Sequence, residues 1–249
     1  MSQINTNNFN TNDWNTAGAS AEGVAIKTFM TSVFAWMFGA LLITSIIAFA
    51  FATVPELEIL ILDKTGGEIE FTALAYVLMI APLGLVLLMS LGFAKLPYPV
   101  LVSIFILYSA ATGASLSTIF LSYDISIIGA SFAITAGMFG TMAVMGFTTK
   151  ADLSKFGSIM RMGLIGIIIA TVVNFFMHSE MMSYVISFAG VAVFTGLTAY
   201  DVQKLKQIGA GITHENQTGS KLAVLGALTL YLDFLNLFLF ILRIMGGRK

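Results

Sequence analysis

Apolar and polar segments alternate along the chain, and the apolar ones are unusually long. They cover residues 28–54, 71–93, 99–120, 126–148, 157–177, 181–208 and 222–244. A helix of about 20 apolar residues crosses the hydrocarbon core of a bilayer. Because lipid offers no hydrogen-bond partner for backbone N–H and C=O groups, each crossing segment must be helical. The pattern therefore predicts an all-α integral membrane protein with seven transmembrane helices.

The first 23 residues differ from the rest of the chain, because they are rich in Asn and Thr and poor in aliphatic side chains. They contain neither the basic start nor the apolar stretch of a secretory signal peptide. Such a composition cannot bury much apolar surface, so we predict a disordered tail over residues 1–23. Residues 24–249 contain no convincing internal repeat and are predicted to form a single transmembrane domain.

The composition agrees with this class and excludes others. The 249 residues are 57% hydrophobic and 10% charged, whereas about a quarter of the residues of a soluble domain carry charge. The formal net charge of -1 leaves no basic surface for nucleic acid. Because the chain has no cysteine, disulfides and thiolate metal sites are excluded.

Lysines are divided unequally between the two sets of loops that seven crossings would create. The loops on the side of the N-terminus hold most of them, and the opposite loops hold Lys64 alone. The lysines of the first set are Lys27, Lys95, Lys150, Lys155, Lys204, Lys206 and Lys221. Short cytoplasmic loops carry the excess of positive residues, so the N-terminus is predicted to be cytoplasmic. The C-terminal end of the chain disagrees with this rule. Seven crossings would place it outside the cytoplasm, yet it includes Arg243, Arg248 and Lys249.

Small residues recur at every fourth position in the third and fourth segments, which predicts faces where helix backbones approach closely. In the third segment they are Ser109, Gly113 and Ser117. In the fourth they are Gly129, Ala133, Gly137 and Thr141. We expect both faces to pack against neighbouring helices.

Asp233 lies in the middle of the last apolar segment, in the stretch TLYLDFLNLFLFILR. A carboxylate there opposes insertion by about 2.5–3.5 kcal/mol. Thr229 and Asn236 fall on the same helical face, so this face is predicted to turn toward protein or water. Ionisable residues inside a membrane are usually functional. The alternative is a neutral, hydrogen-bonded carboxyl with a structural role.

Asp201 is the second candidate, near the end of the sixth segment in FTGLTAYDVQKLK, with Thr198 on its face. The alternative is an exposed helix-end carboxylate paired with Lys204. The sixth and seventh helices are consecutive and antiparallel. Asp201 lies roughly 10 Å and Asp233 roughly 16 Å from the inner ends of their helices. A modest tilt would bring the two carboxyls together.

Two carboxylates in contact restrict the chemistry of the site. At about 4 Å they repel by roughly 4 kcal/mol at an effective dielectric constant of 20. One shared proton removes this repulsion, and the pair then titrates as a unit. Loss of the proton would push the two helices apart and leave oxygen acceptors for a cation. Hard oxygen ligands suit Ca²⁺, so Asp201 and Asp233 are possible Ca²⁺ ligands, with water and carbonyls completing the shell.

Three enzyme or pigment classes fit poorly. Intramembrane aspartyl proteases also carry Tyr-Asp on one helix and an aspartate on the next, as this chain does at Asp201 and Asp233. They need the tripeptide Gly-x-Gly immediately before the second aspartate. In this chain the tripeptide before Asp233 is Leu-Tyr-Leu. A retinal protein needs a lysine in the last helix, and residues 222–244 contain none. A serine-type membrane protease needs a Ser–His pair, and His178 and His214 fall in loops. We expect no enzymatic activity.

Two other classes stay open from the residues alone. A buried carboxylate pair is also a proton relay, so a proton-coupled transporter of another solute is an alternative to a channel. The second class that stays open is a regulatory membrane protein that carries no flux. Flux measurements separate these classes.

Three stretches resemble signatures of the transmembrane Bax-inhibitor-motif family. They are AYDVQKLK at 199–206, LYLDFLNLFLFILRIMG at 230–246 and FTTKADLSKFG at 147–157. The resemblance implies two three-helix layers around a central C-terminal helix. It also implies a pH-sensitive calcium leak whose gate sensor is the pair Asp201 and Asp233.

Further expectations follow from the resemblance. We expect a bacterial family member in the inner membrane, without a cofactor, whose partners are the lipid bilayer and calcium ions. Arg243 matches a basic residue common near the end of the last helix. The chain departs from some relatives after the second segment, where GFAKLPYP contains Lys95 but no arginine cluster that could engage the first aspartate. This departure implies a weaker or different latch.

Overall fold

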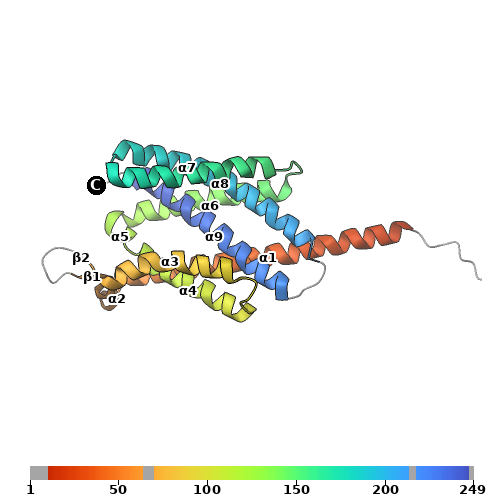
Figure 1. The fold of residues 1–249 in the computed structure, drawn as a ribbon, viewed down its shortest axis with the longest axis horizontal. Helices are drawn as coiled ribbons and strands as arrows, with labels where there is room; N and C mark the ends of the chain where they lie inside the picture. Colours follow the sequence, from red (N-terminus) through yellow and green to blue (C-terminus); the bar gives the residue numbers. More distant parts are fainter. Residues whose placement is uncertain (1–10, 64–69, 213–216, 247–249) are drawn as a thin grey trace, which may run out of the picture.

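The computed structural model describes residues 11–63, 70–212 and 217–246. Within these ranges seven helices are long and apolar enough to cross a membrane, which confirms an all-α integral membrane protein. The helices are α1 (Thr11–Thr53), α3 (Ala73–Gly92), α4 (Tyr98–Leu116), α6 (Ile125–Thr148), α7 (Ser154–Met177), α8 (Glu180–Ala210) and α9 (Gln217–Gly246) (Figure 1).

Short elements fill two of the connections. Between α1 and α3 lie α2 (Pro55–Ile61) and the antiparallel strands β1 (Leu62–Asp63) and β2 (Glu70–Phe71), where the sequence predicted a plain loop. Proline at the first helical position favours such a short helix. After α4 the helix is interrupted and resumes as α5 (Ile119–Ser122), and α4 and α5 together form one candidate span.

The beginning of α1 differs from the sequence prediction. The helix begins at Thr11, inside the segment predicted to be a disordered tail through residue 23. Adding residues to an existing helix avoids the cost of nucleation, so a long transmembrane helix can extend into a polar segment. Residues 1–10 of that prediction lie outside the described residues.

Helix α9 occupies the centre of the bundle. It contacts α1 and α4 on one side and α6 and α8 on the other, and it crosses diagonally between them in Figure 1. Of its most apolar stretch, 67% is buried inside the protein, against 6% for α7. The last helix is therefore central, a point that periodicity alone could not decide. The two-layer arrangement of the other six helices stays a prediction.

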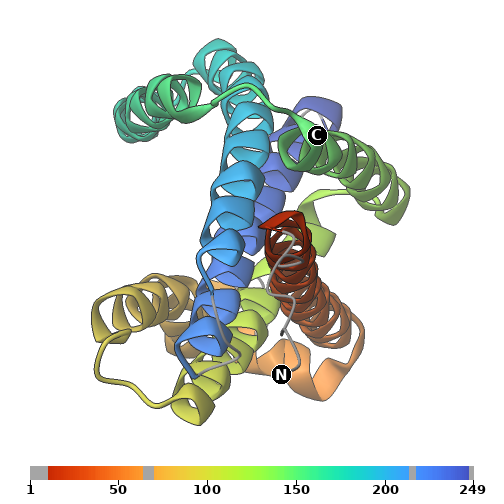
Figure 2. The same ribbon diagram turned by 90° about the vertical axis from the view of Figure 1, so that its right-hand side faces the viewer.

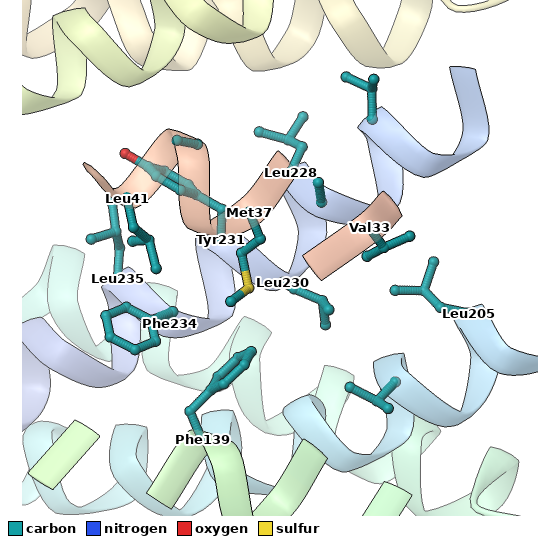
Figure 3. Packing of buried hydrophobic residues seen from close by; sticks show 14 of the residues in the cluster. Val33, Met37, Leu41, Phe139, Leu205, Leu228, Leu230, Tyr231, Phe234 and Leu235 are labelled. Atoms are coloured by element: carbon teal, nitrogen blue, oxygen red, sulfur yellow. The ribbon is translucent and has the colours of Figure 1, made fainter. Parts of the chain in front are cut away.

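The core is built around the apolar side chains of α9. Leu230 and Tyr231 are fully buried. Figure 3 shows Leu230 next to Met37 of α1, whereas the hydroxyl of Tyr231 contacts Thr44 of the same helix. On the other side the ring of Phe234 packs edge-on against Phe139 of α6, with ring centroids 5.5 Å apart. These contacts hold α9 against α1 and α6 at the depth of Asp233.

The predicted small-residue face of the third segment is a packing face. Ser109 and Ser117 are buried. A Cβ added to Gly113 would lie 2.6 Å from the carbonyl oxygen of Thr44 in α1, so the two backbones meet there without room for a side chain.

The prediction that the small-residue face of the fourth segment packs against neighbouring helices is wrong. Gly129, Ala133, Gly137 and Thr141 are exposed, and nothing lies within 4 Å of a Cβ added to Gly129 or Gly137. The opposite face of α6 is buried instead, through Ser131, Thr135, Phe139, Ala143 and Gly146. This face also carries small residues at helical spacing, so the spacing identified a helix but could not select its packing face.

Gly146 provides a test of this correction. A Cβ on Gly146 would collide with the backbone carbonyl of Ala199 in α8. We expect Gly146→Ala to lower the free energy of unfolding by about 1–3 kcal/mol, the usual effect of overpacking. Thermal denaturation in detergent measures this, with Gly137→Ala as the control on the exposed face. Equal denaturation midpoints for the two variants would contradict the assignment of the packing face.

Candidate functional site

Asp201 and Asp233 come together between α8 and α9. Their carboxyl groups are hydrogen-bonded to each other. Asp233 is buried, with 5% of its surface exposed, and Asp201 is half-buried. A hydrogen bond between two carboxyl groups requires a proton on one of them, because two carboxylates offer acceptors alone. The arrangement can therefore hold one shared proton in the interior of the bundle.

Close backbone packing fixes the position of Asp201. Helix α8 lies between α6 and α7, as Figure 2 shows, and contacts both. Gly146 of α6 meets the backbone at Ala199, and Gly157 of α7 leaves just the space that the ring of Tyr200 fills. Because the two residues just before Asp201 are packed closely in this way, α8 has little freedom to rotate Asp201 away from α9.

One oxygen of Asp233, Oδ2, is buried and accepts no hydrogen bond from an N–H or hydroxyl donor among the residues that the structure describes. A buried acceptor without a partner typically costs about 1–3 kcal/mol. Such an oxygen can be satisfied by a proton shared with Asp201, by a water molecule or by a cation.

Two positive charges act on Asp201. Lys204 of α8 and Arg161 of α7 both interact electrostatically with the carboxyl. The guanidinium of Arg161 lies over the ring of Tyr200, 5.3 Å from its centroid. Asp201 is therefore not simply the exposed partner of Lys204, since Asp233 and Arg161 also face it. Sequence reasoning missed Arg161, although an arginine inside an apolar segment was a signal that could have found it.

The predicted supporting residues have partners of their own. The donor groups of Thr198, Thr229 and Asn236 bond to carbonyls four residues earlier in their own helices, at 2.8, 3.1 and 2.8 Å. Arg243 is exposed in the last turn of α9, about 15 Å along the axis from Asp233. None of these hydrogen bonds reaches the aspartate pair, and the supporting roles of the four residues stay predictions.

Gln203 ties the loop between α6 and α7 to α8. Its side-chain amide donates to the carbonyl of Ala151 at 2.7 Å, and its oxygen accepts from the amide of Leu153 at 2.9 Å. In the same loop, hydrogen bonds from the Ser154 hydroxyl and amide hold the pKa of Asp152 below its usual range. No sequence pattern predicts this role for Gln203, which fixes the start of α7 and so the position of Arg161.

A second buried polar cluster lies on the other side of α9. The hydroxyl of Tyr231 is 2.6 Å from that of Thr44, and the Thr44 hydroxyl also lies 2.9 Å from the carbonyl oxygen of Ser109. Tyr108 packs edge-on against Tyr231, with ring centroids 5.5 Å apart. This cluster links α9 to α1 and α4, whereas Asp233 links it to α8. Sequence reasoning missed the cluster because its members are far apart in the chain.

The described residues contain no group of three or more His, Asp or Glu side chains that could hold a metal ion. A Ca²⁺ ion normally takes six to eight oxygen ligands. The aspartate pair can supply part of such a shell, and water or backbone carbonyls would have to supply the rest.

The seven described spans and the aspartate pair between α8 and α9 define a class of helical integral membrane protein. A comparison with known families identifies this class. The model of the family described as "Inhibitor of apoptosis-promoting Bax1" matches residues 26–249. The chain belongs to this family, the Bax inhibitor family, which confirms the resemblance recognised in the sequence.

Its bacterial relatives are similar over most of their length. The inner membrane protein YbhL of Escherichia coli strain K12 is 44% identical over 227 residues, which cover 90% of this chain and 93% of that protein. An uncharacterized protein of Borreliella burgdorferi is 40% identical over 89% of this chain and 92% of its own. The Rickettsia prowazekii protein RP147 is 37% identical over 90% of this chain and 91% of its own.

Proposed function

We propose that this protein is a pH-sensitive calcium-leak channel, gated by the proton that Asp201 and Asp233 share. We place it in the inner membrane of a bacterium, because its Escherichia coli relative is an inner membrane protein, with its N-terminus in the cytoplasm. One observation carries the proposal: the buried carboxyl of Asp233, at the middle of the central helix, is hydrogen-bonded to the carboxyl of Asp201 on the preceding helix.

The shared proton acts as the latch. While the pair holds it, the hydrogen bond joins α8 to α9 and the path stays closed. When the proton leaves, two negative charges at about 4 Å repel by roughly 4 kcal/mol at an effective dielectric constant of 20. Lys204 and Arg161 offset part of the charge on Asp201, but no such cation acts on Asp233 among the described residues. The repulsion therefore favours movement of α9 away from α8.

Separation of the pair also prepares it for a cation. Both carboxylates become acceptors, and Asp233 Oδ2 already accepts no bond from an N–H or hydroxyl donor among the described residues. Two carboxylates with water and carbonyls bind Ca²⁺ weakly enough for release, which conduction requires. Calcium is thus the permeant ion of the proposal and not a resident cofactor. Because proton loss opens the path, flux should increase as the pH rises.

Calcium flux into liposomes that contain the pure protein tests this proposal. We expect influx down a calcium gradient, with a rate that increases between about pH 6 and pH 8, the range of a proton-sharing carboxyl pair. Stoichiometric proton movement against calcium would favour a proton-coupled transporter instead. No flux of calcium at any pH would overturn the channel, and a regulatory role without flux would then be the better account.

A further inference from the structure

A hollow opens between α1 and α6 on the side of the bundle away from α7. Both helices pack on α8 and α9 but barely on each other, and Figure 2 shows them on the same side of α8 and α9. The hollow has a volume of about 550 Å³, within the range of ligand pockets. Its main lining residues are Lys27, Met30, Thr31 and Phe34 from α1, and Val144 and Phe147 from α6.

The hollow is polar at one end and apolar along the rest. Lys27 lies at the boundary of the first apolar segment, and the next charged residue along the chain is Glu56. Phe147 is next to the last residue of α6, so it lies at the same end of the bundle as Lys27. From Lys27 the lining of α1 runs inward to Phe34 and Ala35, roughly 10 Å deeper.

Positive charge gathers at the polar end. The side chain of Lys27 is exposed there. The ammonium of Lys206 donates to the carbonyl oxygen of Phe147 at 2.8 Å and lies 5.0 Å from the centroid of its ring. Among the described residues that line the hollow, Lys27 is the one charged residue. A ligand with a negative head and an apolar tail complements this distribution.

We propose that the groove between α1 and α6 binds an anionic phospholipid, with its phosphate at Lys27 and an acyl chain along Met30, Phe34 and Val144. The apolar part of the groove continues into the lipid-facing surface of α6, where Val144 is 62% exposed. A bilayer lipid can therefore enter sideways without crossing water. Basic pockets between transmembrane helices recognise anionic headgroups in this way.

The site borders the helix that carries Asp201. Phe29 of α1 packs on Gly209 of α8, and Gly146 of α6 meets Ala199 of the same helix. A lipid wedged between α1 and α6 would therefore stabilise the two walls that hold α8 in place. The proposal does not depend on calcium flux, so it can fail or succeed independently of the proposed function.

Native mass spectrometry of the purified full chain tests the headgroup. The probes are phosphatidylglycerol and phosphatidylcholine with identical acyl chains, added in mild detergent. We expect tighter binding of phosphatidylglycerol. We expect Lys27→Gln to weaken it about fivefold, the effect of one lysine beside an anionic headgroup. Lys95→Gln is the matched control, because Lys95 is an exposed lysine outside the groove.

A second pair of variants tests the acyl-chain part. Ala35→Trp would fill the groove and should reduce binding of both lipids. Leu42→Trp is its control, because Leu42 is a 63% exposed residue of α1 outside the groove. The proposal is overturned if Lys27→Gln behaves like Lys95→Gln, if both lipids bind equally to the wild type, or if Ala35→Trp retains lipid as Leu42→Trp does.

Discussion

Replacing Asp233 by Asn is expected to make calcium flux independent of pH between about pH 6 and pH 8. Asparagine has nearly the same shape and can still hydrogen-bond to Asp201, so α8 and α9 stay packed, but it cannot lose a proton. When one proton controls a gate, the open-to-closed ratio changes by at most about tenfold per pH unit. This slope should vanish in the variant, as measured by calcium influx into liposomes.

Asp152→Asn is the matched control for the loss of a carboxyl. Asp152 lies in the loop between α6 and α7, where hydrogen bonds from Ser154 hold its pKa below the usual range. A lowered pKa means that Asp152 is already ionised well below pH 6, so its charge is constant throughout the test. We expect Asp152→Asn to retain the wild-type pH profile. If Asp233→Asn also retains it, the sensor lies elsewhere.

Asp201→Asn should flatten the pH profile as Asp233→Asn does, and the double variant should be no flatter than either single one. In the proposed gate the two carboxyls share one proton, so removing either carboxyl already removes the titrating unit. Groups that act as one unit are non-additive in a double-mutant cycle, with interaction energies of about 0.5–3 kcal/mol. The flux profiles of the four proteins, measured side by side, give this cycle.

Additive effects of the two substitutions would contradict the shared proton. In that case each aspartate would titrate by itself, Asp201 beside Lys204 and Arg161, and Asp233 in isolation. The same liposome preparations decide between the two outcomes, because additivity requires the double variant to differ from both single variants.

The helices and the aspartate pair could be predicted from the sequence for clear physical reasons. The bilayer forces every crossing segment to be apolar and helical, so hydropathy alone located the seven spans. A carboxyl inside such a span opposes insertion, so Asp233 stood out against its Leu and Phe neighbours. Distances along antiparallel helices then placed Asp201 within about one turn of it, and the structure brings the two together.

The rest of the site depends on contacts between residues far apart in the chain. Arg161 lies over the ring of Tyr200, and this ring fits against α7 because Gly157 has no side chain. Gln203 forms hydrogen bonds with a loop about 50 residues away in sequence. The periodicity of residues along one helix does not predict such contacts between distant segments. The small residues of α6 show the same limit, since two of its faces carry them and the neighbouring helices decide which one is buried.

The central claim is that the closed state holds a proton between Asp201 and Asp233. Infrared spectroscopy of the protein in liposomes tests it most directly, because a protonated carboxyl in an apolar setting has its own C=O stretching band. We expect this band to disappear from the wild-type spectrum as the pH rises from about 6 to 8, over the same range in which calcium flux increases. The band should change in Asp233→Asn but not in Asp152→Asn. A wild-type spectrum with no carboxyl band that titrates in this range would contradict the central claim.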